Sequence, residues 1–497
     1  LTSSSGSFRT KALAQPYLSV PLRQIRGYTA NDGSVGDLDG DGMLELVIHL
    51  TGRGHDNSHE GITDPPILEA YRLDGRFLWR INLGHNIREG AHYTQFLVQD
   101  FDGDGRCEVA CKTADGSADG QGVVIGDPLA DHRNQEGRIL KGPEFLTVFE
   151  GSNGRALDTV PYDPPRHPLT PDPTPDQLKE VWGDGYGNRS DRFLACAPYL
   201  DGVKPSMVFA RGYYTRTVLS AWDLVQGQLK KRWIFDSSQV PEHSGQGNHG
   251  LSVGDVDGDG RDEIVYGSMT LDDDGSGLYS TKLGHGDALH LSDLDPSRPG
   301  QEIFAIHEKP GHGMAATFRD ARTGEVLWSL KGGDAGRGIS LDIDPRHPGS
   351  ECWTSLKSGL YSAKGIKISD KQPFAANFGI YWDGDLLREI LDDTKITKWD
   401  YIGETEKNLL HASDCVSCNG TKATPVFSGD ILGDWREEVI WASKDGNELR
   451  IYSTTLPTKH RVPWLMTDRQ YRSALVWQNT GYNQPPHLSY WLGGKSR

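Results

Sequence analysis

The chain has 497 residues and a formal net charge of −17, and it contains 60 glycines, 27 prolines and 13 tryptophans. The negative charge disfavours nucleic acid and anionic membrane surfaces as partners, and it suits bound cations. No apolar run approaches the length needed to cross a membrane, so we expect no membrane insertion. Glycine supplies the positive φ that tight turns need, so this composition predicts many short strands joined by turns.

Helical periodicity is scarce along the chain. Only short stretches such as TPDQLKEVW, residues 174–182, are compatible with a helix. Cys415 and Cys418 form a C-x-x-C with no second pair, so we do not expect a structural zinc site. A local disulfide and two free thiols both fit this spacing.

The first acidic loop along the chain is GDLDGDGMLEL, which contains Asp37, Asp39, Asp41 and Glu45. Calcium prefers six or seven oxygen ligands, which these carboxylates and the backbone carbonyl near Met43 can supply. The loop is not an EF-hand, because that motif has its bidentate glutamate at position 12, where this chain has an isoleucine. The alternative is a solvated aspartate turn, since Asp and Gly are turn residues.

The acidic loop recurs, and an apolar β-forming run follows almost every copy. Two further full copies, QDFDGDGRCEV and GDVDGDGRDEI, give the candidate metal ligands Asp100, Asp102, Asp104, Arg106, Glu108, Asp255, Asp257, Asp259, Arg261 and Glu263, with the two arginines at the position of Met43. Four weaker copies add Asp293, Asp295, Glu302, Asp342, Asp344, Glu351, Asp383, Asp385, Glu389, Asp430, Asp434 and Glu438. A degenerate eighth copy, PYLDGVKPSMVF, has Ser206 where the glutamate would stand.

The spacing of the copies predicts the architecture. Several intervals between consecutive glutamates lie between about 38 and 63 residues, and a four-stranded propeller blade needs roughly 40 to 50. Eight copies therefore predict an all-β, eight-bladed β-propeller with calcium-binding acidic loops. We expect residues 1–497 to form this single domain, with one long insertion at about residues 126–192, where Pro, Asp and Gly are abundant.

Several polar segments are not explained by the repeat, and most stand shortly upstream of an acidic loop. They contain Asn31, Asp32, Arg211, Tyr214, Asn248, His249, His285, Asp287, His290, Arg337, Asn419, Gly420, Thr421, Lys422 and Tyr482. Equivalent positions of successive blades meet near one end of the channel, so these residues predict a polar, cation-rich pocket there. For each residue alone, a hydrogen bond in a turn or between blades is the alternative. Lys422 and Arg337 are the strongest candidates, because the glycines near them permit close approach of a ligand.

The combination of motifs resembles a known enzyme family. The segments ANDGSVGDLDGDG, GNHGLSVGDVDGDG, HGDALHLSDLDPSRPGQE, CNGTKATP…GDWREEV and YNQPPHLSYWLG together are similar to the family 11 polysaccharide lyases, the rhamnogalacturonan lyases of bacterial pectin degradation. The resemblance runs over nearly the whole chain. It implies an eight-bladed propeller with several calcium ions and cleavage of the galacturonate–rhamnose backbone of rhamnogalacturonan I, an acidic polysaccharide, by β-elimination.

The resemblance also implies residue roles. Lys422 and Arg337 correspond to the catalytic lysine and arginine of the family, and its sugar contacts correspond to Asn31, Asn419, Gly420, Thr421 and Tyr482. We add Arg211 and Tyr214 as further candidate substrate contacts. β-Elimination removes the C5 proton beside a uronate carboxylate, which Arg337 and calcium would neutralise while Lys422 acts as base. His249, His285 and Asp287 are candidates for a metal site near the channel, although one of the histidines is an alternative base.

Two departures from the family accompany these expectations. An N-terminal β-sandwich that family members usually carry is expected to be absent, and Thr51 stands where some members have an aspartate. The polymeric substrate predicts a secreted, cell-surface or periplasmic protein, which we expect to be a monomer. The alternatives are a lyase that acts on another rhamnose-linked uronate polymer and a non-catalytic, calcium-loaded propeller that binds glycan or protein.

Overall fold

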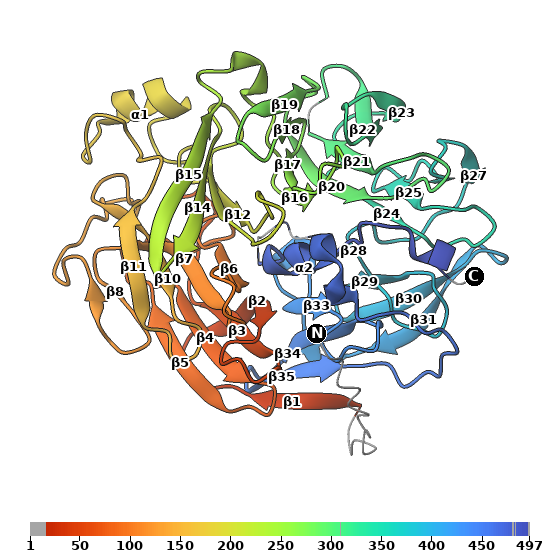
Figure 1. Cartoon of the computed structure of the whole chain (residues 1–497), viewed down its shortest axis with the longest axis horizontal. Coiled ribbons are helices and arrows are strands. Elements are labelled where there is room, and N and C mark those ends of the chain that lie inside the picture. Colours follow the sequence, from red (N-terminus) through yellow and green to blue (C-terminus); the bar gives the residue numbers. More distant parts are fainter. Residues whose placement is uncertain (1–15, 309, 480–481, 483, 496–497) are drawn as a thin grey trace.

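The computed structural model describes residues 16–308, 310–479, 482 and 484–495, and it shows eight antiparallel sheets arranged around a central axis (Figure 1). Each sheet is a blade whose strands follow one another outward from the axis. The expected all-β, eight-bladed propeller is confirmed. Apolar residues of successive strands alternate into the spaces between blades, where they form the buried core.

The first four blades take up roughly the first half of the chain. Blade 1 contains β2 (Thr29–Gly36), β3 (Glu45–Thr51), β4 (Ile67–Arg72) and β5 (Phe77–Asn82), extended by β8 (Ser117–Ala118) and β9 (Val124–Ile125). Blade 2 contains β6 (Phe96–Gln99), β7 (Glu108–Ala114), β10 (Glu144–Phe149) and β11 (Ala156–Pro161). Blade 3 contains β12 (Phe193–Cys196), β13 (Met207–Arg211), β14 (Val218–Val225) and β15 (Gln228–Asp236). Blade 4 contains β16 (Ser252–Gly254), β17 (Glu263–Tyr266), β18 (Met269–Leu271) and β19 (Gly277–Ser280).

The other four blades repeat this pattern. Blade 5 contains β20 (Gly286–Ser292), β21 (Glu302–His307), β22 (Met314–Asp320) and β23 (Val326–Lys331). Blade 6 contains β24 (Gly338–Leu341), β25 (Glu351–Thr354), β26 (Leu360–Tyr361) and β27 (Lys367–Ser369). Blade 7 contains β28 (Phe378–Ile380), β29 (Glu389–Asp392), β30 (Lys395–Asp400) and β31 (Thr405–His411). Blade 8 contains β33 (Phe427–Gly429), β34 (Glu438–Ser443), β35 (Glu448–Tyr452), the short β32 (Cys415–Val416) and β1 (Tyr17–Pro21).

The ring closes through the first and last strands of the propeller. Strand β1 pairs antiparallel with β35, from Tyr17 opposite Tyr452 to Pro21 opposite Glu448. Blade 8 is thus built from both ends of the chain, so opening the ring requires breaking a complete strand pair. This arrangement leaves few exposed strand edges.

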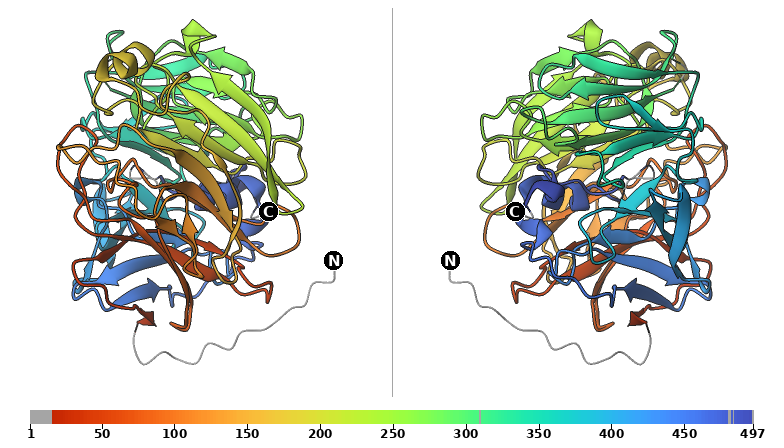
Figure 2. Two further views of the ribbon diagram at one scale, coloured as in Figure 1. Left: turned by 90° about the vertical axis from the view of Figure 1, so that its left-hand side faces the viewer. Right: turned by 90° about the vertical axis from the view of Figure 1, so that its right-hand side faces the viewer.

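The C-terminal segment fills the centre of the ring. Helix α2 (Arg469–Val476) contacts the inner strands β2, β6, β12 and β16 and occupies the middle of the view in Figure 1. Gln478 Nε2 donates a 2.6 Å hydrogen bond to Ser428 O, and Asn479 Nδ2 donates one of the same length to Phe96 O. The side views in Figure 2 show this dark blue segment among the blades. The sequence did not predict this helix.

The other helix confirms a sequence prediction. Helix α1 (Pro175–Trp182) lies within TPDQLKEVW, and Thr174 caps it because its side chain accepts from Gln177 N. The remaining helical turns are the 3₁₀ segments η1 (Pro241–His243), η2 (Gly420–Lys422), η3 (Leu465–Thr467) and η4 (Leu492–Lys495). No helix of the described residues has the length and apolar character needed to cross a membrane.

The structure corrects the expected insertion at residues 126–192. That range contains β10 and β11, the two outer strands of blade 2, so only its flanking loops and α1 are additions to the blade. All six cysteines are buried free thiols, which decides between the two alternatives for Cys415 and Cys418.

Neighbouring blades are joined by a contact that the sequence did not predict, in which a tryptophan of one blade packs on a glycine of the next; we call this contact an aromatic lock. The indole nitrogens of Trp79, Trp233 and Trp328 donate to carbonyl oxygens of the next blade, at Gly151, Asp273 and Ala363, over 2.6–2.8 Å. A glycine with positive φ lies against each indole, because a Cβ at Gly154, Gly275 or Gly365 would stand 2.5–2.9 Å from ring atoms. Three of the tryptophans and three of the glycines therefore have a packing role between blades.

Replacing the glycine of one lock tests its contribution. In Gly365→Ala, the new methyl group would stand 2.7 Å from Trp328 Cγ, in addition to the strain of φ +73°. Gly227→Ala is the matched control, because its φ is +74° and nothing lies within 4 Å of its Cβ. We expect the control to lose about 1–2 kcal/mol and Gly365→Ala to lose distinctly more, as measured by thermal melting. Equal losses would contradict a packing role for the lock.

Candidate active site

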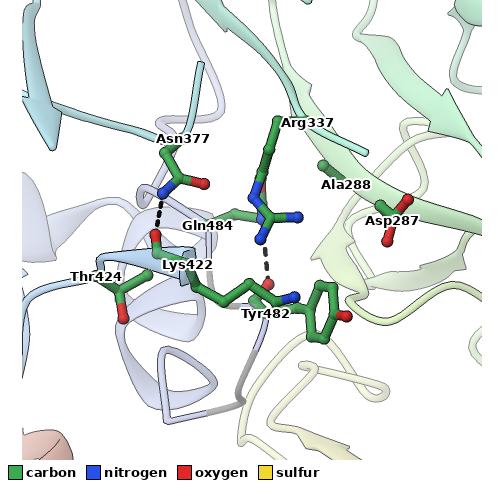
Figure 3. Close-up of a pocket in the computed structure, with 8 residues that line it drawn as sticks. All are labelled: Asp287, Ala288, Arg337, Asn377, Lys422, Thr424, Tyr482 and Gln484. Carbon is green, nitrogen blue, oxygen red and sulfur yellow. Dashed lines mark hydrogen bonds between the residues drawn. The ribbon is translucent and has the colours of Figure 1, made fainter. Parts of the chain in front are cut away.

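A polar pocket lies at one end of the central channel (Figure 3). It is lined by Asp287, Ala288, Arg337, Asn377, Lys422, Thr424, Tyr482 and Gln484. Six of these residues lie within five positions of the start of an inner strand, as Arg337 does before β24 and Asn377 before β28, and Tyr482 and Gln484 belong to the C-terminal segment. Equivalent positions of successive blades therefore meet here, as the sequence predicted.

The geometry of a tight turn positions Lys422. Asn419 and Ala423, on either side of η2, both have left-handed backbone conformations, with φ of 60° and 52°. Asn377 Nδ2 donates to the Lys422 carbonyl oxygen. Burial, reinforced by the positive charge of Arg337, lowers the pKa of Lys422 to about 8. A substantial fraction of this side chain is therefore a neutral amine slightly above neutral pH.

Tyr482 brings an aromatic ring to the same point. Lys422 Nζ lies 3.4 Å from the centre of the Tyr482 ring, and Arg337 Cζ lies 5.5 Å from it. The ring also stacks on His249, with 4.0 Å between the centres and 9° between the planes. Burial raises the pKa of Tyr482 to about 12, so its hydroxyl stays protonated and can donate a hydrogen bond. One tyrosine thus contacts both cations and a histidine.

A candidate cation site adjoins this pocket. His249, His285 and Glu308 each direct a potential ligand atom into one space within 4.8 Å. His285 Nδ1 donates a 2.6 Å hydrogen bond to Gly247 O, which leaves the lone pair of Nε2 facing Glu308 Oε2 at 3.2 Å. Two acceptors at this separation require a cation between them, either a proton or a metal ion. Burial raises the pKa of nearby Asp287 to about 6, which bound positive charge would counteract.

The structure brings most predicted substrate contacts to this end of the channel. Asn419 Nδ2 donates a 2.8 Å hydrogen bond to the buried Asp32, whose other oxygen lies 3.4 Å from Asn31 Nδ2, so blades 1 and 8 are linked here. Gly420 and Thr421 are exposed on the turn that carries Lys422. The hydroxyl of Tyr214 lies 3.3 Å from His249 Nε2.

Arg211 is placed elsewhere. Its side chain has no solvent exposure, and its guanidinium donates to Glu144 over 2.7 and 2.9 Å and to Ser190 O over 2.8 Å. Lys112 and Arg166 pair with the same glutamate at 2.8 and 3.0 Å. Arg211 therefore joins blades 2 and 3 through a buried ion cluster and does not line the pocket, contrary to the sequence interpretation.

All the acidic loops lie at the opposite end of the channel, because each follows the last residue of an inner strand. In the first loop, Asp37 accepts from Gly40 N and Gly42 N over 2.7 and 2.8 Å, and Asp41 accepts from Met43 N over 2.8 Å. The loops at residues 100–108 and 255–263 repeat these bonds, including those to Arg106 N and Arg261 N. Aspartates of all three loops converge closely enough to hold a metal ion.

A buried glutamate closes every loop except the degenerate one. In each case Oε2 accepts a hydrogen bond from the backbone amide of the second loop residue. Glu45 accepts from Leu38 N at 2.8 Å, and Glu263 accepts from Val256 N at 2.7 Å. The five other glutamates of the repeat make the same bond: Glu108, Glu302, Glu351, Glu389 and Glu438. In the degenerate loop Ser206 instead donates a 2.6 Å hydrogen bond to Asp223.

The glutamates fit a cation. Oε1 of Glu263, Glu302 and Glu351 is buried and has no hydrogen-bond partner among the described residues. A buried carboxylate oxygen of this kind is costly unless positive charge neutralises it. Oxygen is also the ligand atom that calcium prefers, and Asp272 and Asp273, which the sequence interpretation missed, add carboxylates beside Glu263.

Some residues of the pocket end were also missed. Glu308, Asn377 and Gln484 were not predicted, and neither was His92, whose ring lies 5.5 Å from that of Tyr482. Glu308 directly follows β21, at the pocket end of blade 5. The sequence offered one signal for Glu308: it is an acidic residue at the end of the second strand of the blade that also contributes His285.

The comparisons with known proteins agree with this geometry. The sequence profile described as "Rhamnogalacturonan lyase family 11, C-terminal domain" matches residues 19–497. The chain is 53% identical to rhamnogalacturonan endolyase YesW of Bacillus subtilis (strain 168) over 506 residues, covering 99% of this chain and 80% of YesW. It is also 53% identical to rhamnogalacturonan exolyase YesX of the same organism over 517 residues, covering 98% of this chain and 83% of YesX.

Solved structures give the same result. The crystal structure of YesW superposes with a TM-score of 0.94 at 54% identity, covering 98% of this chain and 84% of that chain. The crystal structure of exotype YesX superposes with a TM-score of 0.93 at 52% identity, covering 97% of this chain and 83% of that chain. Fold and sequence are therefore shared over nearly the whole of this chain.

The buried glutamates predict a pH-dependent response to calcium. In the metal-free protein, burial raises the pKa of Glu45 to about 7 and that of Glu263 to about 8, from an ordinary value of 4.5. A raised carboxyl pKa favours the folded state at low pH, and this contribution is lost as the pH rises toward 8. We expect calcium to raise the melting temperature above that in chelator, with a larger gain at pH 8 than at pH 5. A gain independent of pH would contradict this, and magnesium serves as the control ion.

Proposed function

Because the chain belongs to rhamnogalacturonan lyase family 11, we propose that it cleaves the galacturonate–rhamnose backbone of rhamnogalacturonan I by β-elimination, with Lys422 as the base. The observation that carries this proposal is the position of Lys422. Its amine lies against the Tyr482 ring and near Arg337, in a pocket where its pKa is about 8. A base with a pKa close to the working pH is effective in proton abstraction.

In the proposed reaction the neutral amine of Lys422 takes the C5 proton of the galacturonate. The electrons of the C–H bond form a C4–C5 double bond, the C4–O bond breaks, and the departing oxygen takes a proton from water. Negative charge develops at the uronate carboxylate in the transition state, and the guanidinium of Arg337 pairs with it. Tyr482 keeps Lys422 and Arg337 in place through its ring face.

We also propose that the protein binds calcium, both beside the pocket and in the acidic loops. His249, His285, Asp287 and Glu308 would hold one ion beside the pocket, and its positive charge would help to neutralise the uronate carboxylate and to acidify the C5 proton. Imidazole is an unusual calcium ligand, but the hydrogen bond from His285 Nδ1 to Gly247 O leaves Nε2 available for a cation. The ions of the acidic loops are structural in this proposal, since those loops lie at the other end of the channel. A polymeric substrate further suggests action outside the cytoplasm.

The deciding assay follows the ultraviolet absorbance of the unsaturated uronate product. The protein is incubated with rhamnogalacturonan I, with unbranched polygalacturonan as the parallel substrate, each in calcium and in chelator. We expect the absorbance to rise with rhamnogalacturonan I in the presence of calcium, and we expect this rise to be lost in chelator. A rise with polygalacturonan alone would support a different uronate specificity, and no rise with either polymer would support a binding propeller. The lengths of the earliest products distinguish internal from terminal cleavage.

Removing the proposed base tests its role. We expect Lys422→Ala to lower kcat by roughly 10²–10⁴-fold, the usual contribution of a general base, without lowering the melting temperature. Lys407→Ala is the control, because it removes a lysine far from the pocket. Lys407 lies on β31, the outer strand of blade 7, where its largely exposed side chain pairs with Asp400. Near-normal turnover in Lys422→Ala would exclude the lysine as base.

The pH dependence gives an independent test. A base acts in its deprotonated form, so we expect kcat/KM to rise with pH and to level off above about 8, as Lys422 loses its proton. In Arg337→Gln, the positive charge that helps to lower this pKa is gone, so the rise should move to higher pH as well as weaken. A profile that rises at the ordinary pKa of histidine would instead favour one of the histidines as base.

A further inference from the structure

One acidic loop contains a cation that belongs to the protein. In blade 7, Lys398 Nζ lies 2.7 Å from Asp385 Oδ2 and 3.0 Å from Glu389 Oε1, and it also contacts Asp383 Oδ2. The glutamate is fully buried and the lysine side chain is 20% exposed. The three donors of one ammonium group therefore face three carboxylates.

The strand register explains why this loop differs. Lys398 lies on β30, and the pairing of β29 with β30 places it directly opposite Glu389. In blade 5 the residue opposite Glu302 is Asp320, and in blade 4 the register places Asp272 opposite Glu263. Where this position is acidic, the loop gathers negative charge that needs an external cation. Where it is a lysine, the chain supplies the positive charge.

We propose that the acidic loop of blade 7 binds no metal ion and is held closed by Lys398 instead. The atoms that would coordinate an ion, Glu389 Oε1 and the outer oxygens of Asp383 and Asp385, are those that bind the ammonium group. A calcium ion at the same oxygens would stand within a few ångströms of Nζ, where charge repulsion in a partly buried site is strong. The lysine and the ion exclude each other.

The first blade shows the contrast. Arg72 occupies the equivalent position opposite Glu45 and contacts Asp39 and Asp41, the counterparts of Asp383 and Asp385. Its Nε stays 4.0 Å from Glu45 Oε1, whereas Lys398 Nζ lies 3.0 Å from Glu389 Oε1. Asp37, which has no counterpart in blade 7, adds a further carboxylate to that loop. Only the ammonium group of Lys398 binds the closing glutamate directly and so takes the place of an ion. This proposal rests on calcium binding by the other acidic loops, and it is independent of the lyase activity.

The test counts bound calcium by native mass spectrometry in four proteins. Asp385→Asn should bind as many ions as the wild type, because the loop holds none. One ion fewer in Asp385→Asn would overturn the proposal. Lys398→Met should gain one ion when calcium is in excess, since its carboxylates lose their counter-charge. Lys407→Met, a change on the neighbouring strand β31, should keep the wild-type count.

Thermal melting in chelator gives a second readout. Without calcium, we expect Lys398→Met to melt several degrees below both the wild type and Lys407→Met, and calcium to restore part of the loss. Equal melting of the two methionine variants would overturn the role of Lys398. If the wild type bound no calcium at all, the calcium proposal would fail, and the melting comparison would still decide whether Lys398 closes this loop. The Asp385→Asn count keeps the test valid if Lys398→Met does not fold.

Discussion

Seven of the eight blades of this propeller are organised around a buried glutamate. The glutamate that begins the second strand accepts a backbone hydrogen bond from the acidic loop, as Glu45 does from Leu38, and so fixes the loop to the blade. The same burial makes the ionised carboxylate costly, which creates a need for positive charge at each of these seven repeats. Under the proposal that the acidic loops bind calcium, folding is coupled to cations, which in blade 7 are replaced by an ammonium group of the chain.

The two ends of the channel have separate tasks. The acidic loops follow the inner strands and stabilise the blades. The pocket residues lie near the starts of the inner strands or in the C-terminal segment, and they carry the proposed chemistry. Lys422, Arg337 and Tyr482 are not part of the repeat, so they can specialise without disturbing the loops that hold the blades together. The rim of the ring is free to vary in loop length, as the additions around α1 show.

The sequence predicted the features whose residues are close together in the chain. The acidic repeat is local, so it gave the number of blades and identified β-strand starts such as Glu263. Lys422 and Arg337 stood out because of their glycine-rich surroundings. Arg211 was misplaced, because sequence does not show whether a side chain turns toward the channel or into the blade. Glu308 and Lys398 act through partners in other strands or blades, and only the register of the sheets brings them together.

The path of the last residues through the ring has a consequence for biosynthesis. The segment enters the channel near Asp430, passes through it as α2, presents Tyr482 at the far end, and returns so that Trp491 donates to Asp342. All eight blades precede this segment in the chain. A polypeptide still emerging from the ribosome can therefore pair the strands of all its blades before it has a complete pocket, because the pocket also needs residues that follow the last blade.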